Sequence, residues 1–179
     1  MIVNGQILLH RAPIKNMLTG KERKHGVSYG LAEAGYDIRI KQEILFVPNS
    51  QPICILVDGQ PQRDEDGEIR TGSFCLASTV EEFQMPKRLV GVVHDKSTWA
   101  RQGLSVYNTV IEPGWCGFLT LELNFRGSRP VTIPAGCGIA QVLFHALAEE
   151  GAYQGKYQNQ EDRPVESLWD EAKDGPRRG

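Results

Sequence analysis

Short segments of alternating hydrophobic and polar residues run along most of the chain. In the clearest one, 118–125, one face carries Leu119, Leu121, Leu123 and Phe125, and the other carries Phe118, Thr120, Glu122 and Asn124. Because successive side chains of a strand point to opposite faces of its sheet, this pattern predicts a strand with one buried face. Further strands are predicted at 36–40, 44–47, 53–57, 73–78, 89–94, 104–108, 131–133 and 139–146.

Helical patterns are few. One short helix is predicted at 4–9, and a second follows Ser97, which we expect to cap it, and ends at Gly103. The Gly- and charge-rich stretch 19–35 is expected to be a loop, and the polar stretch 58–72 a hairpin or loop. Many short strands with one or two short helices predict a mainly β fold, a distorted β-barrel or jelly-roll-like body.

The composition indicates one soluble domain. The chain has 179 residues, of which 40% are hydrophobic and 23% charged, enough for one substantial core. We assign 1–160 to a single β domain and 161–179 to a charged C-terminal tail with Trp169 as its large apolar anchor. The tail is expected to be loosely ordered or docked on a neighbouring subunit.

Charge and hydropathy exclude several classes of protein. The net charge of −2 argues against a nucleic-acid-coating protein, so any polyphosphate must be held by a local cluster of cations. No run approaches the roughly 20 apolar residues that span a bilayer, and no signal-peptide core is present. We therefore expect no membrane partner and a cytoplasmic location, in a bacterial, archaeal or phage-infected cell.

The cysteine pattern does not support a zinc site. The four cysteines, Cys54, Cys75, Cys116 and Cys137, form no CxxC pair. The chain also lacks the HxE and PCxxC motifs with which zinc-dependent nucleobase deaminases activate water. Any deamination by this chain is expected to proceed without zinc.

Two groups of residues are candidates for chemistry. Ser97 and Arg101 are spaced to share one helical face, and Lys96 adds a second cation, which together would suit a phosphate subsite. Glu122 lies on the polar face of its strand, where partial desolvation would raise its pKa and suit it to proton transfer near neutral pH. The pattern fits an exposed strand glutamate equally well.

Five segments carry a family resemblance. They are AGYDIRI (34–40), MPKRLVGVVHDKSTWARQGL (85–104), EPGWCGFLTLE (112–122), PAGCGIAQVLF (134–144) and YQGKYQNQ (153–160). In these segments and their order, the chain resembles the dCTP deaminase branch of the trimeric dUTPase superfamily. The resemblance implies a dUTPase-type fold, a homotrimer with sites between subunits, and dCTP as substrate.

The resemblance also implies roles for individual residues. Glu122 takes the place of the family's catalytic glutamate, and Ser97 and Arg101 match a serine and an arginine that organise the site, often from a neighbouring subunit. Lys96 and Thr98 match further positions of that motif, with lysine in place of the usual arginine. Gln141 matches a nucleotide-contacting residue, although a hydrogen bond at a sheet edge is an equal alternative. For Asp37 a structural role is at least as well supported as a catalytic one.

The C-terminal segment resembles the family's segment that closes over the triphosphate. Its candidate residues are Tyr153, Lys156, Tyr157 and Gln160, which offer rings for sugar or base and a cation and amide for phosphate oxygens. A disordered polar tail is the alternative. Mg²⁺ is expected to enter with the triphosphate and to be held through the substrate phosphates rather than by protein ligands.

One departure from the family concerns the segment that reads the base. The segment 105–112, SVYNTVIE, is shorter than its counterpart in the resembled enzymes. Asn108 could pair with either cytosine or uracil by flipping its amide, while Thr109 could equally be an ordinary hairpin residue. The base, whether cytosine, uracil or a modified pyrimidine, is therefore open.

The leading interpretation is a deaminase that converts dCTP to dUTP and ammonia. The first alternative is a dUTP diphosphatase or bifunctional enzyme that gives dUMP and pyrophosphate, with Glu112 activating water at the α-phosphate. The second is a non-catalytic nucleotide-binding regulator, because a fold does not fix a function. Inhibition by dTTP at the same site is a further family property that this chain could share.

Overall fold

The computed structural model describes residues 1–48, 54–63, 67, 69, 72–107 and 109–169. Its elements are β1 (Ile2–Val3), α1 (Gly5–Arg11), β2 (Lys21–Lys24), β3 (Val27–Leu31), β4 (Tyr36–Arg39), β5 (Ile44–Val47), β6 (Cys54–Val57), β7 (Gln60–Pro61), β8 (Phe74–Gln84), β9 (Leu89–Asp95), α2 (Ser97–Ala100), β10 (Leu104–Val106), β11 (Val110–Ile111), β12 (Cys116–Phe125), β13 (Val131–Ile133) and β14 (Gly138–Ala146). The predicted mainly β fold is confirmed.

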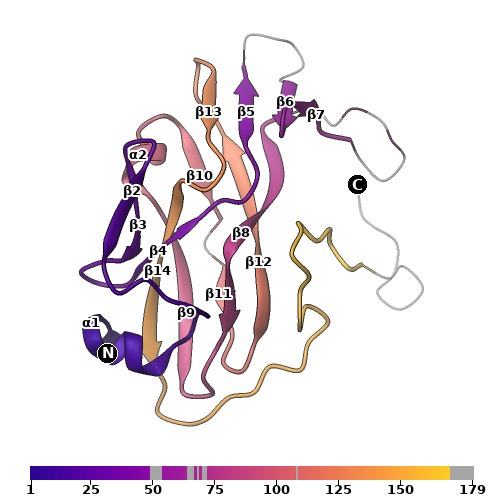
Figure 1. Ribbon diagram of the computed structural model, residues 1–179. Helices are drawn as coiled ribbons and strands as arrows, with labels where there is room; N and C mark the ends of the chain where they lie inside the picture. Colours follow the sequence, from indigo (N-terminus) through magenta and orange to yellow (C-terminus); the bar gives the residue numbers. More distant parts are fainter. Residues whose placement is uncertain (49–53, 64–66, 68, 70–71, 108, 170–179) are drawn as a thin grey trace.

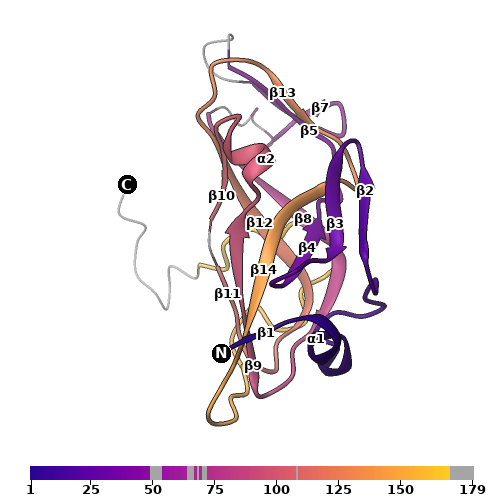
Figure 2. The ribbon, with the colours of Figure 1, turned by 90° about the vertical axis from the view of Figure 1, so that its left-hand side faces the viewer.

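Within the described residues, the strands form three antiparallel sheets. The first has the order β11-β9-β14-β4-β3-β2, with β1 also paired to β14. The second has the order β10-β12-β8, and the third β13-β5-β6-β7. Figure 1 shows the third sheet at one end of the molecule, and Figure 2 shows the other two from the side. Short strands in packed sheets bury one face each, as the alternating pattern requires.

The core lies between these sheets. Phe46 of β5 stacks on Phe125 of β12, with 4.9 Å between the ring centroids. Leu121 and Leu123 of β12 are buried beside Phe125, while Glu122 and Asn124 are only partly buried. The predicted alternation is thus confirmed over 121–125, whereas Leu119 and Thr120 are both buried at a shift in the strand pairing between Phe118 and Thr120. The functional consequence of the alternation is that Glu122 points away from the core.

Strand β8 is longer than the strand predicted at 73–78. Strand β8 reaches Gln84, well beyond the predicted 73–78, because its second half buries polar side chains that break the apolar pattern. Thr79 donates to the Glu81 carbonyl at 2.8 Å, and Glu81 is paired with Arg39 at 2.8 Å. Buried polar groups are tolerated where each has a partner, so the strand continues.

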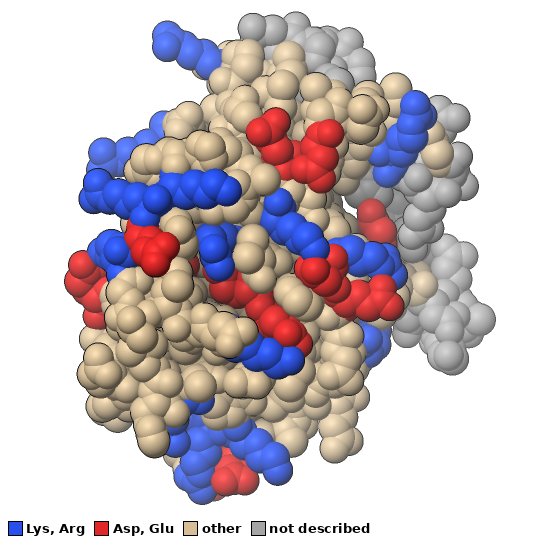
Figure 3. Space-filling model, viewed as in Figure 1, with Lys and Arg blue, Asp and Glu red and all other residues tan. Residues whose placement is uncertain are grey.

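The prediction of a loop at 19–35 is wrong. Strands β2 and β3 form a hairpin there, and its turn places His25 and Gly26 at φ of 51° and 77°. Every residue of β2 is exposed, which is why no alternation marks it. Figure 3 shows basic side chains gathered at this edge of a face on which acidic and basic groups otherwise intermingle.

Both predicted helices are present, with changed ends. Helix α1 extends past the predicted 4–9 to Arg11. Helix α2 begins at Ser97, but its N-cap position is Lys96 and no side chain caps it, so the predicted capping by Ser97 is wrong. Gly103 takes φ of 91° after the helix, as expected. No helix among the described residues is long and apolar enough to cross a membrane.

Candidate functional site

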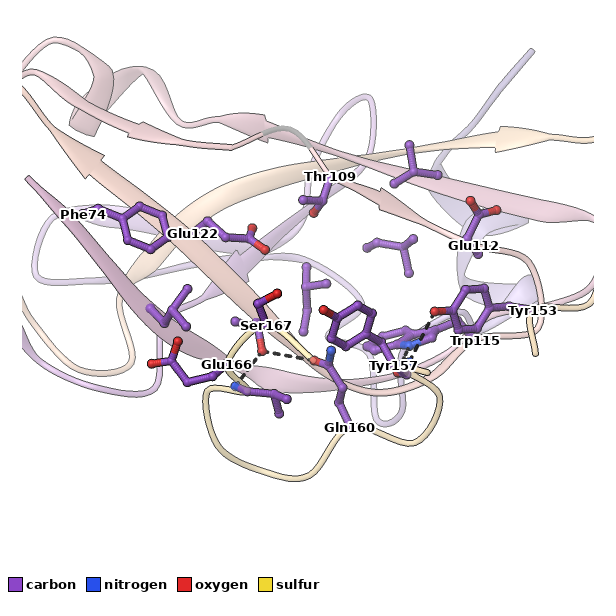
Figure 4. A pocket seen from close by; sticks show the side chains of 16 residues that line it. Phe74, Thr109, Glu112, Trp115, Glu122, Tyr153, Tyr157, Gln160, Glu166 and Ser167 are labelled. Atoms are coloured by element: carbon purple, nitrogen blue, oxygen red, sulfur yellow. Dashed lines mark hydrogen bonds between the residues drawn. The ribbon is translucent and has the colours of Figure 1, made fainter. Parts of the chain in front are cut away.

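A pocket of about 440 Å³ lies against the face of β8 and β12 that carries Glu122. The two strands contribute Phe74, Leu76, Leu119, Thr120 and Glu122 to its wall. The rest of the wall consists of Thr109, Val110, Ile111, Glu112, Trp115, Tyr153, Tyr157, Gln160, Val165, Glu166 and Ser167. In Figure 4, Phe74 and Glu122 lie toward one end of the pocket, and Glu112, Trp115 and Tyr153 toward the other.

Glu122 presents a desolvated carboxyl group to this pocket. Its Oε2 atom is buried and has no hydrogen-bond partner among the described residues. Burial raises the pKa of the Glu122 carboxyl above its ordinary value, because a less polar environment disfavours the charged form. A carboxyl group in this state exchanges protons closer to neutral pH than a solvated glutamate does. The interpretation as an exposed strand glutamate is wrong.

A bulge in β12 precedes Glu122 along the strand. The pairing of β12 with β8 changes register between Phe118 and Thr120. At this irregularity the backbone N–H of Leu119 donates to the Thr79 hydroxyl at 3.0 Å, so this buried N–H keeps a hydrogen-bond partner. Beyond the bulge the ladder resumes, with Glu122 opposite Leu76. A bulge that redirects side chains beside a site is a common device.

The segment 105–112 closes one side of the pocket. The N–H of Tyr107 donates to the Glu122 carbonyl at 3.0 Å, and the N–H of Val106 donates to Asp95 Oδ1 at 2.7 Å. Thr109 and Glu112 line the pocket. The third candidate from this segment, Asn108, lies outside the described residues.

The segment 153–160 packs along the other side. The indole N–H of Trp115 donates to the Tyr157 carbonyl at 2.6 Å. The Gln158 amide oxygen accepts from the Cys116 N–H at 2.8 Å, while its NH₂ group donates to the Gly114 carbonyl at 2.9 Å. These contacts place Tyr153, Tyr157 and Gln160 in the pocket wall. A disordered tail is therefore not what the structure shows for this segment.

The chain then crosses the pocket. Gln160 forms a parallel bridge with Gly117, and the N–H of Val165 donates to the Thr120 hydroxyl at 3.1 Å. Val165, Glu166 and Ser167 line the pocket as a result, and Figure 4 shows Gln160, Glu166 and Ser167 along one side of it. The tail segment, residues 161–169, thus lies against the pocket of its own chain. Residues 170–179 lie outside the described part.

The other predicted site residues lie elsewhere on this chain. Ser97, Thr98 and Arg101 are exposed on and after α2 and do not line the pocket. Lys96 is largely buried and donates to Asp37 Oδ2. The predicted residues therefore fall into two separate groups, with Glu122 in one and the α2 residues in the other.

Gln141 and Lys156 are also directed away from the pocket. The Gln141 amide donates to Asp37 Oδ1 at 3.1 Å, so it belongs to the Asp37 cluster within the first sheet. The Lys156 ammonium donates to the Leu168 carbonyl and lies 5.5 Å from the centroid of the Tyr157 ring. Neither residue lines the pocket of its own chain.

The pocket wall is acidic. It includes Glu112, Glu122 and Glu166, and no lysine, arginine or histidine is among its described lining residues. A polyphosphate cannot be held by such a wall alone, because its charge would meet carboxylates without compensation. The described wall residues therefore supply no cation for an anionic ligand.

The described residues contain no group of three or more His, Cys, Asp and Glu side chains that could hold a metal ion. The pocket does offer the exposed carboxylate of Glu112. A single carboxylate suits Mg²⁺ that keeps most of its ligands from water and phosphate.

Sequence patterns missed several residues of the wall. Phe74 and Leu76 come from β8, and Val165, Glu166 and Ser167 from the tail segment. Thr120 could have been identified, because the alternation in 118–125 places it on the same strand face as Glu122. Nothing in the local pattern of the tail segment indicates that it returns to β12.

Comparisons with known proteins show the family and the fold to which this chain is similar. Residues 14–147 match the family described as dCTP deaminase-like. The chain is 39% identical to a dCTP deaminase of Herpetosiphon aurantiacus over 82% of this chain and 86% of that one. It is also 39% identical to a dCTP deaminase of Roseiflexus castenholzii, over 75% and 79% of the two chains. Among solved structures, the 2'-deoxycytidine 5'-triphosphate deaminase of Agrobacterium tumefaciens has a similar fold, with a TM-score of 0.53 and 16% identity over 80% of this chain and 47% of that chain.

Proposed function

This chain belongs to the dCTP deaminase-like family, and on that premise we propose that it converts dCTP and water to dUTP and ammonia. The observation that carries the proposal is the buried, unpartnered carboxyl oxygen of Glu122 inside the pocket. A proton-transfer group is what hydrolytic deamination needs from the protein, since water must lose protons and the amine must gain one.

The reaction then proceeds in two stages at C4 of cytosine. Glu122 takes a proton from water as the water oxygen bonds to C4, and it passes that proton to N3. It next takes the remaining hydroxyl proton and delivers it to the amino group as the C4–N4 bond breaks. Ammonia leaves, a carbonyl forms at C4, and Glu122 returns to its initial state.

The end of the pocket near Glu122 is suited to the base. Phe74 and Leu76 provide apolar surface there, and Thr109 provides a hydroxyl. Aromatic and aliphatic walls with a few polar groups are typical of sites that bind planar rings. The cytosine ring lies at this end, since C4 must be within reach of Glu122.

The triphosphate needs cations that the pocket wall lacks. The exposed Arg101 of a second copy is the cation proposed to supply this charge, with the Ser97 hydroxyl as a hydrogen-bond donor beside it, in a homotrimer with sites between subunits. Mg²⁺ enters with the triphosphate, and Glu112 is the described wall residue suited to one of its ligand positions. The metal lowers the charge of the phosphates, while Glu122 carries the proton transfers.

A second activity is favoured by one observation. Glu112 shares the pocket with Glu122, so a carboxylate is present that could activate water at the α-phosphate. A bifunctional enzyme that continues from dUTP to dUMP and pyrophosphate would use both residues in one pocket. The non-catalytic regulator would bind nucleotide with the same wall and release no product.

The test is an incubation of the protein and Mg²⁺ with dCTP or dUTP, with ammonia, pyrophosphate and nucleotides measured together. Ammonia and dUTP from dCTP without pyrophosphate are the expected products. Pyrophosphate and dUMP would establish the bifunctional reaction or the diphosphatase. Binding of dCTP without formation of any product would show that the protein is a nucleotide-binding regulator and not an enzyme.

A further inference from the structure

The Thr120 side chain lies where the strand that bears Glu122 meets the C-terminal segment. It is 7% exposed and lines the same pocket as Glu122, from the same face of β12. Alternate residues on one strand face lie about 7 Å apart, so changes at Thr120 act close to the proton-transfer group.

The Thr120 hydroxyl joins two parts of the chain to β12 at once. It donates to the Gln160 side-chain oxygen at 3.1 Å and accepts from the Val165 N–H at 3.1 Å. One donor and two acceptor lone pairs make a hydroxyl capable of both roles. A methyl group at this place would leave the Gln160 oxygen and the Val165 N–H without this partner.

The ion pair that joins the tail segment to the loop after β4 is weaker. Asp162 pairs with Lys41, and both side chains are about half exposed, at 50% and 41%. An exposed ion pair contributes little, because water screens it and two long side chains must be ordered. The contact of Leu168 with the Tyr157 hydroxyl joins the tail segment only to the segment 153–160. Of these contacts, the buried one with Thr120 is therefore the stronger attachment of the tail segment to the rest of the domain.

We propose that Thr120 is a positioning residue of this site, whose hydroxyl holds the tail segment across the pocket in which Glu122 works. The inference rests on the proposed deamination for its effect on turnover. Its effect on the tail does not depend on that reaction. A tail held in place before substrate arrives lowers the ordering cost of binding, so its release raises the apparent dissociation constant.

The experiment compares Thr120→Val, which keeps the shape and removes the hydroxyl, with Thr120→Ser, which keeps the hydroxyl. Thr132→Val is the matched control, because Thr132 is exposed in β13, outside the pocket. Cleavage by a glutamate-specific protease without nucleotide reports the tail directly, because a protease must draw the chain on both sides of the bond after Glu166 into its own site, and a docked tail segment resists that local opening. We expect cleavage there to be about tenfold faster in Thr120→Val and unchanged in the other two variants.

Steady-state kinetics with dCTP form the second readout. We expect KM to rise about tenfold in Thr120→Val with little change in kcat, and Thr120→Ser to restore the original KM. Equal cleavage in Thr120→Val and the unchanged protein would overturn the inference, as would faster cleavage with an unchanged KM. If the unchanged protein releases no ammonia while the cleavage difference persists, Thr120 still holds the tail and the proposed deamination fails.

Discussion

Lys96 donates a hydrogen bond to Asp37 in the protein interior, with exposed side-chain fractions of 11% and 3%. Asp37 also accepts from the Ser28 hydroxyl at 2.9 Å and from Gln141 at 3.1 Å. This cluster attaches the start of α2 to β3, β4 and β14. Lys96 is thereby already paired within its own chain, whereas Ser97, Thr98 and Arg101 are exposed on and just after α2.

Loss of the Lys96 ammonium should destabilise the fold. In Lys96→Met the Asp37 carboxylate stays buried without its cation, which should lower the free energy of unfolding by about 3 kcal/mol. Urea denaturation measures this. Lys15→Met is the matched control, because its pair with Glu82 is 47% and 36% exposed and should contribute less than about 1 kcal/mol. Equal losses in both variants would contradict a structural role for the buried pair.

Replacement of Glu122 should separate binding from chemistry. Glu122→Gln keeps the shape and removes the proton-transfer group, so ammonia release should be abolished while the dissociation constant for dCTP stays within about tenfold. Ammonia release and calorimetric titration measure the two effects. Glu149→Gln, at an exposed position outside the pocket, is the control and should remain active. Intact turnover in Glu122→Gln would remove the proposed role of Glu122.

The same variant should also change the pH dependence of stability. The pKa of Glu122 is raised in the folded protein by burial. The folded protein therefore holds this proton more tightly than the unfolded chain, and the stability this provides is lost as pH rises through the folded pKa. The Tm of Glu122→Gln relative to the unchanged protein should rise between about pH 4 and 8. A Tm difference that is constant over this range would show that Glu122 is not desolvated.

Gly117 should be needed for the docking of the segment that follows β14. It has φ of +131°, and a Cβ atom there would lie 2.5 Å from the Gln160 backbone nitrogen. Gly117→Ala should displace Gln160 and raise the KM for dCTP by about tenfold or more. Gly59→Ala controls for backbone strain alone, since Gly59 has φ of +76° with no atom within 4 Å of the added Cβ. An unchanged KM in Gly117→Ala would show that docking of Gln160 does not support binding.

Mixing of two inactive variants tests the shared site. In the proposed trimer each site takes Glu122 from one copy and Arg101 from another, so Glu122→Gln and Arg101→Ala damage different partners. Refolded together in equal amounts, they should regain about a quarter of the original activity, because both intact groups meet by chance at that frequency. Each variant refolded alone is the control. No recovery in a mixed population confirmed by mass spectrometry would contradict a site shared between copies.

The outward direction of Glu122 was predictable from the sequence because the apolar stripe of Leu121, Leu123 and Phe125 allows one register only. The family-like segments likewise indicated the candidate residues of α2 and the C-terminal segment. The hairpin of β2 and β3 was not predictable from alternation, since both faces of β2 are exposed. Neither was the bond from Val165 to Thr120, which joins residues 45 positions apart and leaves no local pattern.

The pairing of Lys96 with Asp37 shows a second limit of sequence reasoning. A lysine beside Ser97, in a motif that resembles a phosphate-binding one, is expected to face the ligand. The Lys96 side chain instead points into the interior of its own chain and pairs with Asp37. Burial of one charge depends on the presence of another on a distant strand, and no local pattern contains that information.

The contact between Trp115 and the Tyr157 carbonyl also makes Trp115 an intrinsic fluorescent probe of whether the segment 153–160 is docked. Trp115 is 5% exposed, and the segment that shields it is the one that forms one side of the pocket. Departure of that segment would hydrate the indole and shift its fluorescence to longer wavelength. Opening and closing of the pocket can therefore be followed optically in the unlabelled protein, in real time and without turnover.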